Sequence, residues 1–419
     1  MIDYSKLPHN RVLCIDMKSF YASVEAVNQG LDPLTTLLAV VGDKNRPGSV
    51  VLAASPVLKK EFGIRTGSRL YEIPPDPRIR IVNARMGLYL DTSMQITNLL
   101  NQYAPKEAIH TYSVDESWVI CDGLEQIFGS ARDIARLIQE DIKLQTGLPC
   151  AIGIGPNKLL AKMVLDIHAK KKGIAECKYE DIPKLLWPTP IEDVWGIGHR
   201  MKRNLNRMGI YILEDLAKCS LAKLKQKYGV MGEQLYYHAW GVDLSPIFVD
   251  PSAEMRKGFS NGITLMRDYN KDEVPTVIYE ITDHLASRMR EINAACRTVS
   301  LSFGYSKHEL KKGFSRSFTL PEATNVSKRL YDTCIALYSQ ANVMGKIRTV
   351  HVAVSNLVSD DAIQLDLFSG PQDEKLRLLG SAIDAIHARF GGASVFRACS
   401  LTDAGTHLGR TQKIGGHFQ

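Results

Sequence analysis

The order of the apolar segments between residues 11 and 173 fits few folds. In order they read as strand, helix, two strands, helix and strand: Arg11–Asp16, Gly87–Tyr103, the two halves of AIHTYSVDESWVICDG, Ser130–Thr146 and LPCAIGIG. This is the order of a split βαβ, or ferredoxin-like, domain with one insertion. In that fold the first strand lies beside the hairpin of strands two and three. We therefore expect Asp16 to approach Asp115 and Glu116.

The insertion after the first strand has its own local signals. Two apolar runs, TLLAVVG and SVVLAAS, flank the turn sequence DKNRPG and predict a β-hairpin. The following SPVLKKEFG begins with Ser-Pro and ends at Gly63, which is typical of a short helix.

Two adjacent acids, Asp115 and Glu116, interrupt an otherwise apolar strand hairpin. Unpaired buried carboxylates are costly and usually survive beside a metal or another cation. Strand alternation would send the two side chains to opposite faces, so we expect a bend at the hairpin tip. Together with Asp16 they suit a pair of Mg²⁺ ions, which prefer oxygen ligands and assist phosphoryl transfer. A metal-independent acid/base pair is the alternative, but it leaves Asp16 unexplained.

The composition is that of a soluble globular protein of several domains. The chain has 419 residues, and 45% are hydrophobic. It contains no apolar run near the roughly 20 residues that cross a bilayer, and its first residues lack a signal-peptide core, so we expect no membrane partner and a cytoplasmic location. The eight cysteines form no Cys-x-x-Cys pair, so neither a zinc site nor a disulfide framework is supported.

Basic residues gather in the second half of the chain. The net charge is +7, and residues 256–348 hold 15 Lys or Arg against nine Asp or Glu. A phosphate-facing surface would explain this surplus, and a solvated charged face is the alternative. The same segment repeats the strand, helix, two strands, helix, strand order, without acids placed to bind metal.

Between the two sheet domains lies a segment with the pattern of a helix-hairpin-helix DNA-backbone reader. In VWGIGHRMKRNL, Gly196, Ile197 and Gly198 would form the hairpin, with Lys202 and Arg203 nearby. Free backbone N–H groups at a helix N-terminus can bind a phosphate. An ordinary tight turn is the alternative.

The end of the chain contains a short apolar motif in an acidic setting. The pentamer QLDLF offers Gln364, Leu365, Leu367 and Phe368 as anchors for a partner's groove, unless it packs on its own domain. An amphipathic helix follows. SVFRACSL is expected to form a strand, and the final GTHLGRTQKIGGHFQ a loop or a disordered segment.

Four motifs in register, IDMKSFYASVE, YSVDES, IGIGPNKLLAK and VWGIGHRMKRNL, resemble the Y-family translesion DNA polymerases of the DinB/UmuC type. The resemblance covers residues 11–356. It implies an α+β chain with a ferredoxin-like palm, small fingers, a helix-hairpin-helix thumb and a βαββαβ little finger. The implied bounds are palm 1–18 and 85–178, fingers 19–84, thumb 179–248, little finger 256–356 and C-terminal tail 357–419.

The resemblance also implies roles for individual residues. The metal-ligand positions for two Mg²⁺ ions fall on Asp16, Asp115 and the Met17 carbonyl. The position of the catalytic glutamate falls on Glu116, and we expect Glu116 to belong to the metal site as well. Tyr21 occupies the steric-gate position that excludes ribonucleotides, beside Phe20, which is expected in the core. Lys60 and Lys170 fall near triphosphate-binding positions, although the helix before Lys170 is one residue longer than the family pattern. The pentamer resembles the bacterial sliding-clamp-binding peptide.

The implied activity is error-prone, template-directed addition of dNTPs to a primer–template, because small fingers close little protein over the new base pair. Two positions depart from the DinB pattern: Lys18 replaces a second acid, and Val57 replaces a tyrosine that contacts the triphosphate. UmuC-type relatives can also need accessory subunits. A dimeric palm-type cyclase and a non-catalytic DNA-binding factor with an inactive palm are the rival interpretations.

Overall fold

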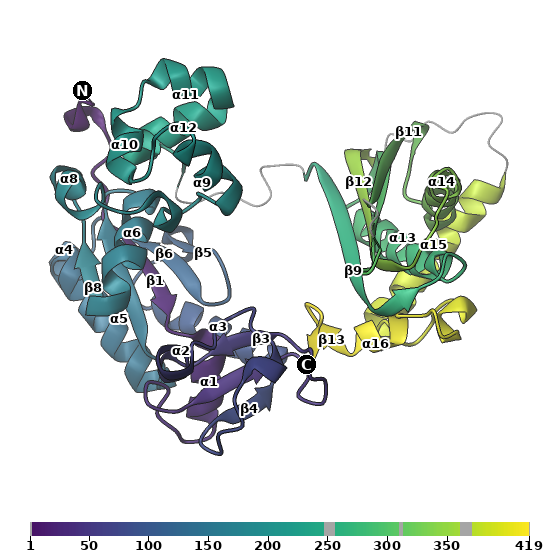
Figure 1. Cartoon of the computed structure of the whole chain (residues 1–419), viewed down its shortest axis with the longest axis horizontal. Coiled ribbons are helices and arrows are strands. Elements are labelled where there is room, and N and C mark those ends of the chain that lie inside the picture. Colours follow the sequence, from purple (N-terminus) through teal and green to yellow (C-terminus); the bar gives the residue numbers. More distant parts are fainter. Residues whose placement is uncertain (1, 247–255, 310–312, 361–370, 419) are drawn as a thin grey trace. The chain divides into compact units, whose positions relative to one another are not determined.

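A computed structural model of the chain describes residues 2–246, 256–309, 313–360 and 371–418 (Figure 1). The chain divides into two compact units, residues 1–250 with 417–419, and residues 251–416. The first unit contains a five-stranded and a three-stranded β-sheet, the second contains a four-stranded sheet, and each unit has its own hydrophobic core.

A five-stranded sheet forms the palm at the centre of the first unit. Its strands lie in the order β5-β6-β1-β7-β8, with β7 and β8 parallel and the other neighbours antiparallel. The bounds are β1 Val12–Met17, β5 Ile109–Thr111, β6 Glu116–Ile120, β7 Cys150–Gly155 and β8 Ile174–Glu176. The expected position of the first strand beside the strand hairpin is therefore confirmed.

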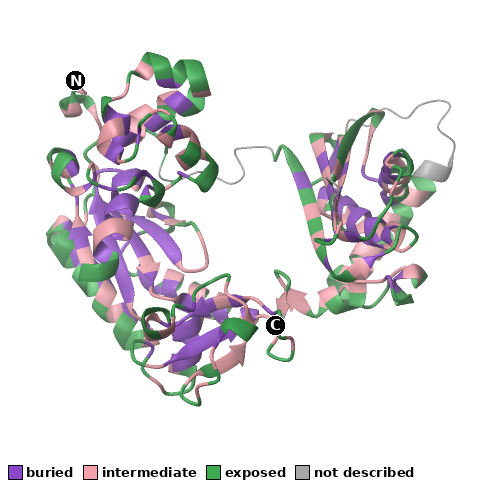
Figure 2. Ribbon diagram, in the orientation of Figure 1, coloured by how far each residue is buried: buried purple, intermediate pink, exposed green. Residues whose placement is uncertain are grey.

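Helices cover both faces of this sheet, which explains why β1 reads as a continuous apolar run. Ile15 and Met17 line a small cavity with residues of α3 on one face, and Val12 and Cys14 share a core with α6 on the other. Figure 2 shows buried residues concentrated in these strands. The palm helices are η3 Lys106–Ala108, α3 Met86–Leu100, α4 Glu125–Phe128, α5 Ala131–Thr146, α6 Lys158–Val164, the π-helical η4 Leu165–Ala169 and α7 Lys170–Lys172.

The insertion after β1 forms the small fingers domain. The predicted hairpin is present as an antiparallel pair, and a third strand joins it in parallel to give the order β3-β2-β4. The predicted short helix also forms, with Ser55 as its N-cap and Gly63 as its C-cap. The elements are α1 Phe20–Asn28, β2 Leu38–Val41, β3 Val51–Ala54, α2 Pro56–Phe62, η2 Leu70–Glu72 and β4 Arg80–Asn83.

Short helices form the thumb, which packs on the palm. Leu205, Leu216 and Leu235 belong to the same core cluster as Val12 of β1 and Leu160 of α6. The elements of this region, with the N-terminal turn that precedes β1, are η1 Tyr4–Lys6, η5 Tyr179–Asp181, α8 Ile182–Leu185, η6 Ile191–Asp193, α9 His199–Asn206, α10 Leu213–Lys218, α11 Leu221–Tyr228 and α12 Val230–Ala239.

The second unit contains the predicted second split βαβ domain, the little finger. Its four antiparallel strands lie in the order β11-β10-β12-β9, and α13 and α14 pack on one face. The bounds are β9 Gly258–Tyr269, α13 Val274–Glu291, β10 Ala294–Tyr305, β11 Phe314–Thr324, α14 Ser327–Ser339 and β12 Ile347–Ser359. Strand β12 thus continues past residue 356, where the little finger was expected to end.

The C-terminal segment is more ordered than its sequence suggests. Helix α15, Pro371–Phe390, is present as expected, and Arg290 of α13 forms an ion pair with its Asp384 (2.6 Å). The predictions for the residues after α15 are wrong. SVFRACSL contains the 3₁₀ turn η8, Ala398–Leu401, in place of a strand. The expected loop forms α16 His407–Thr411 and the short hairpin strands β13 Lys413–Ile414 and β14 His417–Phe418. Across the described ranges, no helix combines the length and apolarity needed to span a membrane.

A buried carboxylate explains why this segment folds. Glu280 of α13 is 5% exposed and accepts hydrogen bonds from the Thr406 and His407 amides and the Thr406 hydroxyl, the amide distances being 3.0–3.1 Å. Arg410 lies 3.4 Å from the same carboxylate. Because these contacts link positions far apart in the sequence, local patterns could not predict them.

We expect Glu280→Gln to loosen this segment. The variant replaces a charged acceptor by a neutral one and so weakens these hydrogen bonds. The free energy of local opening should therefore fall by about 2 kcal/mol. Hydrogen exchange in the full chain should then show the Thr406 and His407 amides exchanging roughly thirtyfold faster. Glu291→Gln, at an exposed position of the same helix, is the matched control and should change nothing. Equal exchange in both variants would contradict the role of Glu280.

Candidate active site

The register of the palm sheet brings two of the three predicted acids together. Asp16 of β1 lies directly opposite Glu116, the first residue of β6, in the antiparallel pair. Strand β5 ends at Thr111, so Asp115 lies in the turn between the strands, where a bend was expected. The Met17 N–H donates to the Asp115 carbonyl (3.0 Å). All three acids therefore lie at one edge of the sheet, the edge where β1 ends and β6 begins.

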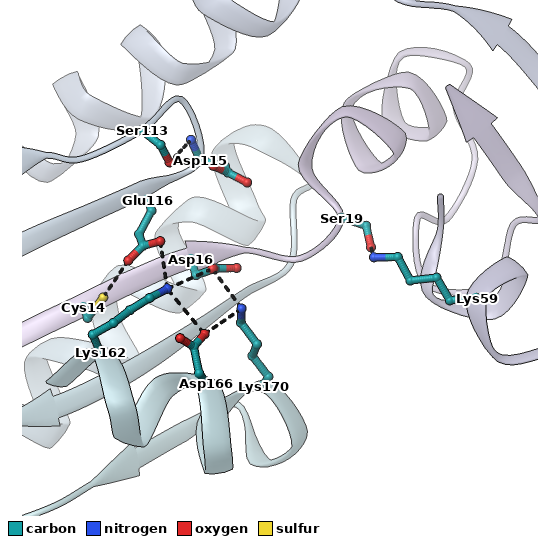
Figure 3. Close-up of polar contacts among 10 residues, drawn as sticks. All are labelled: Cys14, Asp16, Ser19, Lys59, Ser113, Asp115, Glu116, Lys162, Asp166 and Lys170. Carbon is teal, nitrogen blue, oxygen red and sulfur yellow. Dashed lines mark hydrogen bonds and ion pairs between the residues drawn. The ribbon is translucent and has the colours of Figure 1, made fainter. Parts of the chain in front are cut away.

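The two neighbouring acids point in different directions. The Asp115 carboxylate accepts a hydrogen bond from the Ser113 hydroxyl (2.7 Å), and Figure 3 shows it directed away from the Glu116 carboxylate. Glu116 instead accepts from the thiol of Cys14 (3.3 Å) and from Lys162 Nζ (2.8 Å). Burial, followed by the charge of Glu116, raises the pKa of the Cys14 thiol, so this residue remains a neutral donor.

Two lysines lie among the carboxylates (Figure 3). The buried Lys162 Nζ lies 2.8 Å from Glu116, 3.3 Å from Asp166 and 3.8 Å from Asp16. The half-exposed Lys170 Nζ lies 3.2 Å from Asp16 and 2.8 Å from Asp166. The cation that compensates the buried acids in this structure is therefore an ammonium group.

The pKa directions agree with this arrangement. Burial raises the pKa of Asp16, although the charges of Lys170 and Lys162 partly oppose the shift. Burial alone would lower the pKa of Lys162, but the hydrogen bond to Glu116 and the Asp166 charge outweigh it and raise the pKa. Lys162 is therefore held in its charged form beside Glu116.

Sequence reasoning missed Lys162 and Asp166, although a signal for them was present. Lys162, Asp166 and Lys170 recur every four residues, the spacing that places side chains on one helix face. The five-residue π segment η4 lies between the first and the last of them. A π turn accommodates an extra residue in a helix, and beyond this turn Lys170 reaches Asp16.

The oxygen donors at this edge suit a hard divalent cation. Among the described residues, no three His, Cys, Asp or Glu side chains are close enough to hold an ion as they stand. Asp16 and Asp115 nevertheless supply carboxylates, and Met17 supplies a backbone carbonyl at the end of β1, which is the donor chemistry that Mg²⁺ prefers. The Lys170 side chain is 45% exposed and can turn into solvent when a cation binds Asp16. The residues present therefore fit the ion.

Tyr21, the predicted steric gate, rests on a rigid support. Its ring stacks on that of Tyr89, with centroids 4.3 Å apart, and the Tyr89 hydroxyl donates to the buried Glu25 (2.8 Å). Arg85 holds Glu25 with two hydrogen bonds (3.0 and 2.6 Å). Burial and then the charge of Asp115 raise the pKa of Tyr21, so this ring lies near Asp115. Phe20 is buried, as expected.

The fingers direct Lys59 toward the gate segment. Its Nζ donates to the hydroxyl of Ser19 (2.7 Å), the αL residue (φ 49°) that precedes helix α1. Partial burial and then the charge of Lys170 lower the pKa of Lys59, which places the two lysines near each other. The predicted Lys60 is the next residue of α2 and is exposed. Lys59 is thus an additional triphosphate candidate that the family pattern did not indicate.

The thumb hairpin has open backbone. Gly196 adopts φ 87°, which favours glycine, and a Cβ on either Gly196 or Gly198 would meet no atom within 4 Å. Both glycines are exposed, whereas Ile197 is buried and anchors the turn. Of the two predicted basic residues, Lys202 pairs with Glu192 (2.8 Å) and Arg203 is exposed.

Comparison with known proteins places these features in one family. Residues 15–166 match the impB/mucB/samB family, residues 256–367 match the C-terminal domain of that family, and residues 192–243 match "DNA polymerase-iota, thumb domain". "Putative UV-damage repair protein UvrX" of Bacillus subtilis (strain 168) is 48% identical over the whole of both chains. "DNA polymerase IV 2" of the same organism is 37% identical over 97% of this chain and 98% of its own.

A solved structure shows the same fold. The "Y-family DNA polymerase chimera Dbh-Dpo4(243-245)-Dbh" aligns with a TM-score of 0.66 and 20% identity. The alignment covers 83% of this chain and 99% of that one.

Proposed function

The chain belongs to the impB/mucB/samB family of Y-family DNA polymerases, and on this premise we propose that it is an active, template-directed translesion polymerase that adds dNTPs to a primer 3′ end. One observation carries the proposal: Asp16 lies opposite Glu116, and the backbone of Asp115 is hydrogen-bonded to Met17 at the same sheet edge. Buried carboxylates destabilise a folded chain, so a protein that kept the fold without the activity would not need an acid at each of these positions.

The chain's own residues supply most of the required chemistry. Asp16, Asp115 and the Met17 carbonyl would hold two Mg²⁺ ions, which, when bound, stabilise the charge on the attacking and leaving oxygens. Glu116, fixed by Lys162 and Cys14, would orient the primer terminus.

Binding and selection of the nucleotide would fall to residues of the fingers and of the palm helix α7. Lys59, which donates to Ser19 just before α1, and Lys170, which pairs with Asp16, would meet the triphosphate. Lys60 remains a candidate for the same role. Tyr21 would lie under the sugar of the incoming nucleotide and exclude a ribose 2′-hydroxyl.

The two rival functions make different demands on the molecule. A palm-type cyclase needs no helix-hairpin-helix thumb, whereas this chain has an open glycine hairpin in a segment that matches a polymerase thumb domain. A non-catalytic DNA-binding factor needs no cluster of acids. The small three-stranded fingers also support low fidelity, because little protein is available to close on the nascent base pair.

Primer extension tests the proposal directly. The full chain, an undamaged or abasic template and a labelled primer should give template-dependent extension with Mg²⁺ and none with EDTA. Extension that ignores the template base would refute the proposal. Binding of DNA without extension would support the non-catalytic alternative, once the assay has been repeated with a cell extract to supply accessory subunits.

The QLDLF pentamer gives a separate prediction about processivity. It lies at residues 364–368, outside the described residues, so the sliding-clamp partner is proposed from the sequence alone. Leu367→Ala with Phe368→Ala should weaken retention on an immobilised bacterial clamp by about tenfold or more, because apolar anchors dominate such peptides. Extension without the clamp should be unchanged.

A matched control comes from the following helix. Leu378 and Leu379 of α15 are 60% and 46% exposed, and their double alanine variant removes the same kind of apolar surface. This variant should bind the clamp like the wild type. Loss of both clamp binding and unassisted synthesis in the pentamer variant would instead mean that the segment belongs to the folding core.

A further inference from the structure

A row of aromatic rings connects the acid cluster with the thumb hairpin. His110 lies opposite Trp118 in the β5–β6 pair, and Trp118 lies two residues after Glu116, so these side chains share the face of the sheet that carries Glu116. We name His110, Tyr112, Trp118 and Trp195 the aromatic ledge.

The rings of the aromatic ledge are in mutual contact. Trp118 stacks with His110 (centroids 5.7 Å apart) and makes edge contacts with Tyr112 (4.9 Å) and Trp195 (6.2 Å). Tyr112 also contacts Trp195 by its edge (6.3 Å). The four rings therefore form one continuous cluster from palm to thumb.

Exposure distinguishes the support of the ledge from its contact surface. Trp118 is 2% exposed and belongs to the core, whereas Tyr112 is 53% exposed. The Tyr112 N–H donates to the Glu116 carbonyl (2.9 Å), which fixes the backbone of the turn that carries the ring. A rigid, exposed aromatic ring backed by a buried one is suited to contact a ligand at little entropic cost.

The position of the ledge indicates which ligand would cover it. Trp195 immediately precedes Gly196 of the hairpin, and Tyr112 lies three residues before Asp115. Lys158 Nζ lies 6.0 Å from the centre of the Trp118 ring and adds a positive charge beside the ledge. Through its contact with Trp195, the Tyr112 ring lies between the thumb hairpin and the Glu116 turn, where a strand with a phosphate at the hairpin and its 3′ end at Glu116 would pass.

We propose that the aromatic ledge binds the deoxyribose faces of the last nucleotides of the primer strand, with Tyr112 as the contact residue. The bases of a paired primer are already stacked on each other, so the accessible apolar surface of that strand is its sugar edge. The inference rests on the proposed function, which sets the direction of the primer. Within it, Tyr112 positions the 3′ terminus beside Glu116 and takes no part in the chemistry.

Binding measurements without chemistry test the aromatic ledge. Fluorescence anisotropy with a labelled primer–template in EDTA gives the Kd for the full chain and three variants. Tyr112→Ala should weaken binding about tenfold, at the lower end of aromatic contacts to nucleotides, and Tyr112→Phe should stay within about twofold of wild type. Tyr71→Ala, which removes another exposed tyrosine (68% exposed) from the fingers, is the control and should bind like wild type. Equal Kd values for Tyr112→Ala and wild type would overturn the proposal.

Two further readouts identify the contact. A ring on a sugar releases no counterion, so the salt dependence of binding should have the same slope in wild type and Tyr112→Ala. A primer with abasic sugars at its last two positions should keep the Tyr112→Ala effect. Loss of the effect on that primer would show base stacking and refute the sugar contact. Primer extension is measured separately. If Tyr112→Ala weakens DNA binding but the wild-type chain does not extend primers, the ledge proposal is upheld and the polymerase proposal is refuted.

Discussion

Asp115→Asn should lower the rate of primer extension by about a thousandfold or more while leaving DNA binding within about twofold of wild type. The variant keeps the size of the side chain and its contact with Ser113 but removes the negative charge that would hold a divalent cation. Metal-assisted stabilisation of a phosphoryl-transfer transition state contributes several kcal/mol, and each 1.36 kcal/mol corresponds to about tenfold in rate. Single-turnover extension with saturating dNTP measures the effect.

The matched control for this variant is Asp91→Asn, which changes an exposed acid of the palm helix α3. It should extend primers at the wild-type rate. If Asp115→Asn also extended primers normally, the turn acid would be a structural residue and the polymerase site would have to lie elsewhere. Parallel loss of DNA affinity would instead indicate a folding defect.

Tyr21→Ala should raise the ratio of ribonucleotide to deoxynucleotide incorporation about a hundredfold. A clash between the ring and a ribose 2′-hydroxyl is expected to cost up to roughly 3 kcal/mol, which alanine would remove. Deoxynucleotide addition should fall only modestly, because Tyr89, Glu25 and Arg85 keep the rest of the pocket in place. Competition between rGTP and dGTP opposite a template C gives the ratio directly.

Tyr21→Phe serves as the control for the gate. It retains the ring and its stacking on Tyr89, so its selectivity should equal that of wild type. An unchanged ratio in Tyr21→Ala would show that Tyr21 is a core aromatic and that another residue excludes ribonucleotides.

The palm and its acids could be predicted because their signals are local and periodic. The sheet order and the bend were predicted from apolar runs of strand length that are interrupted by Asp16 and by Asp115 and Glu116. One topology satisfies all of these signals. The fingers hairpin and helix α2 followed in the same way from turn residues and from the Ser55 cap.

The remaining features depend on tertiary contacts. The lysine that neutralises Glu116 comes from α6, and only the packing of α6 on the sheet brings Lys162 to it. Helix α2 directs Lys59 rather than Lys60 toward Ser19, and the spacing of the family's motifs did not indicate which of the two lysines does so. The last residues resembled a loop because the acceptor that orders them, Glu280, lies on α13, far away in the sequence.

The most direct measurement of the central claim is a crystal structure of the full chain with primer–template, Mg²⁺ and a non-hydrolysable dNTP. The account predicts cation density coordinated by the carboxylates of Asp16 and Asp115, with Lys170 moved off Asp16 toward the phosphates. Carboxylates that face apart, with no cation between them and the bound nucleotide elsewhere, would contradict it.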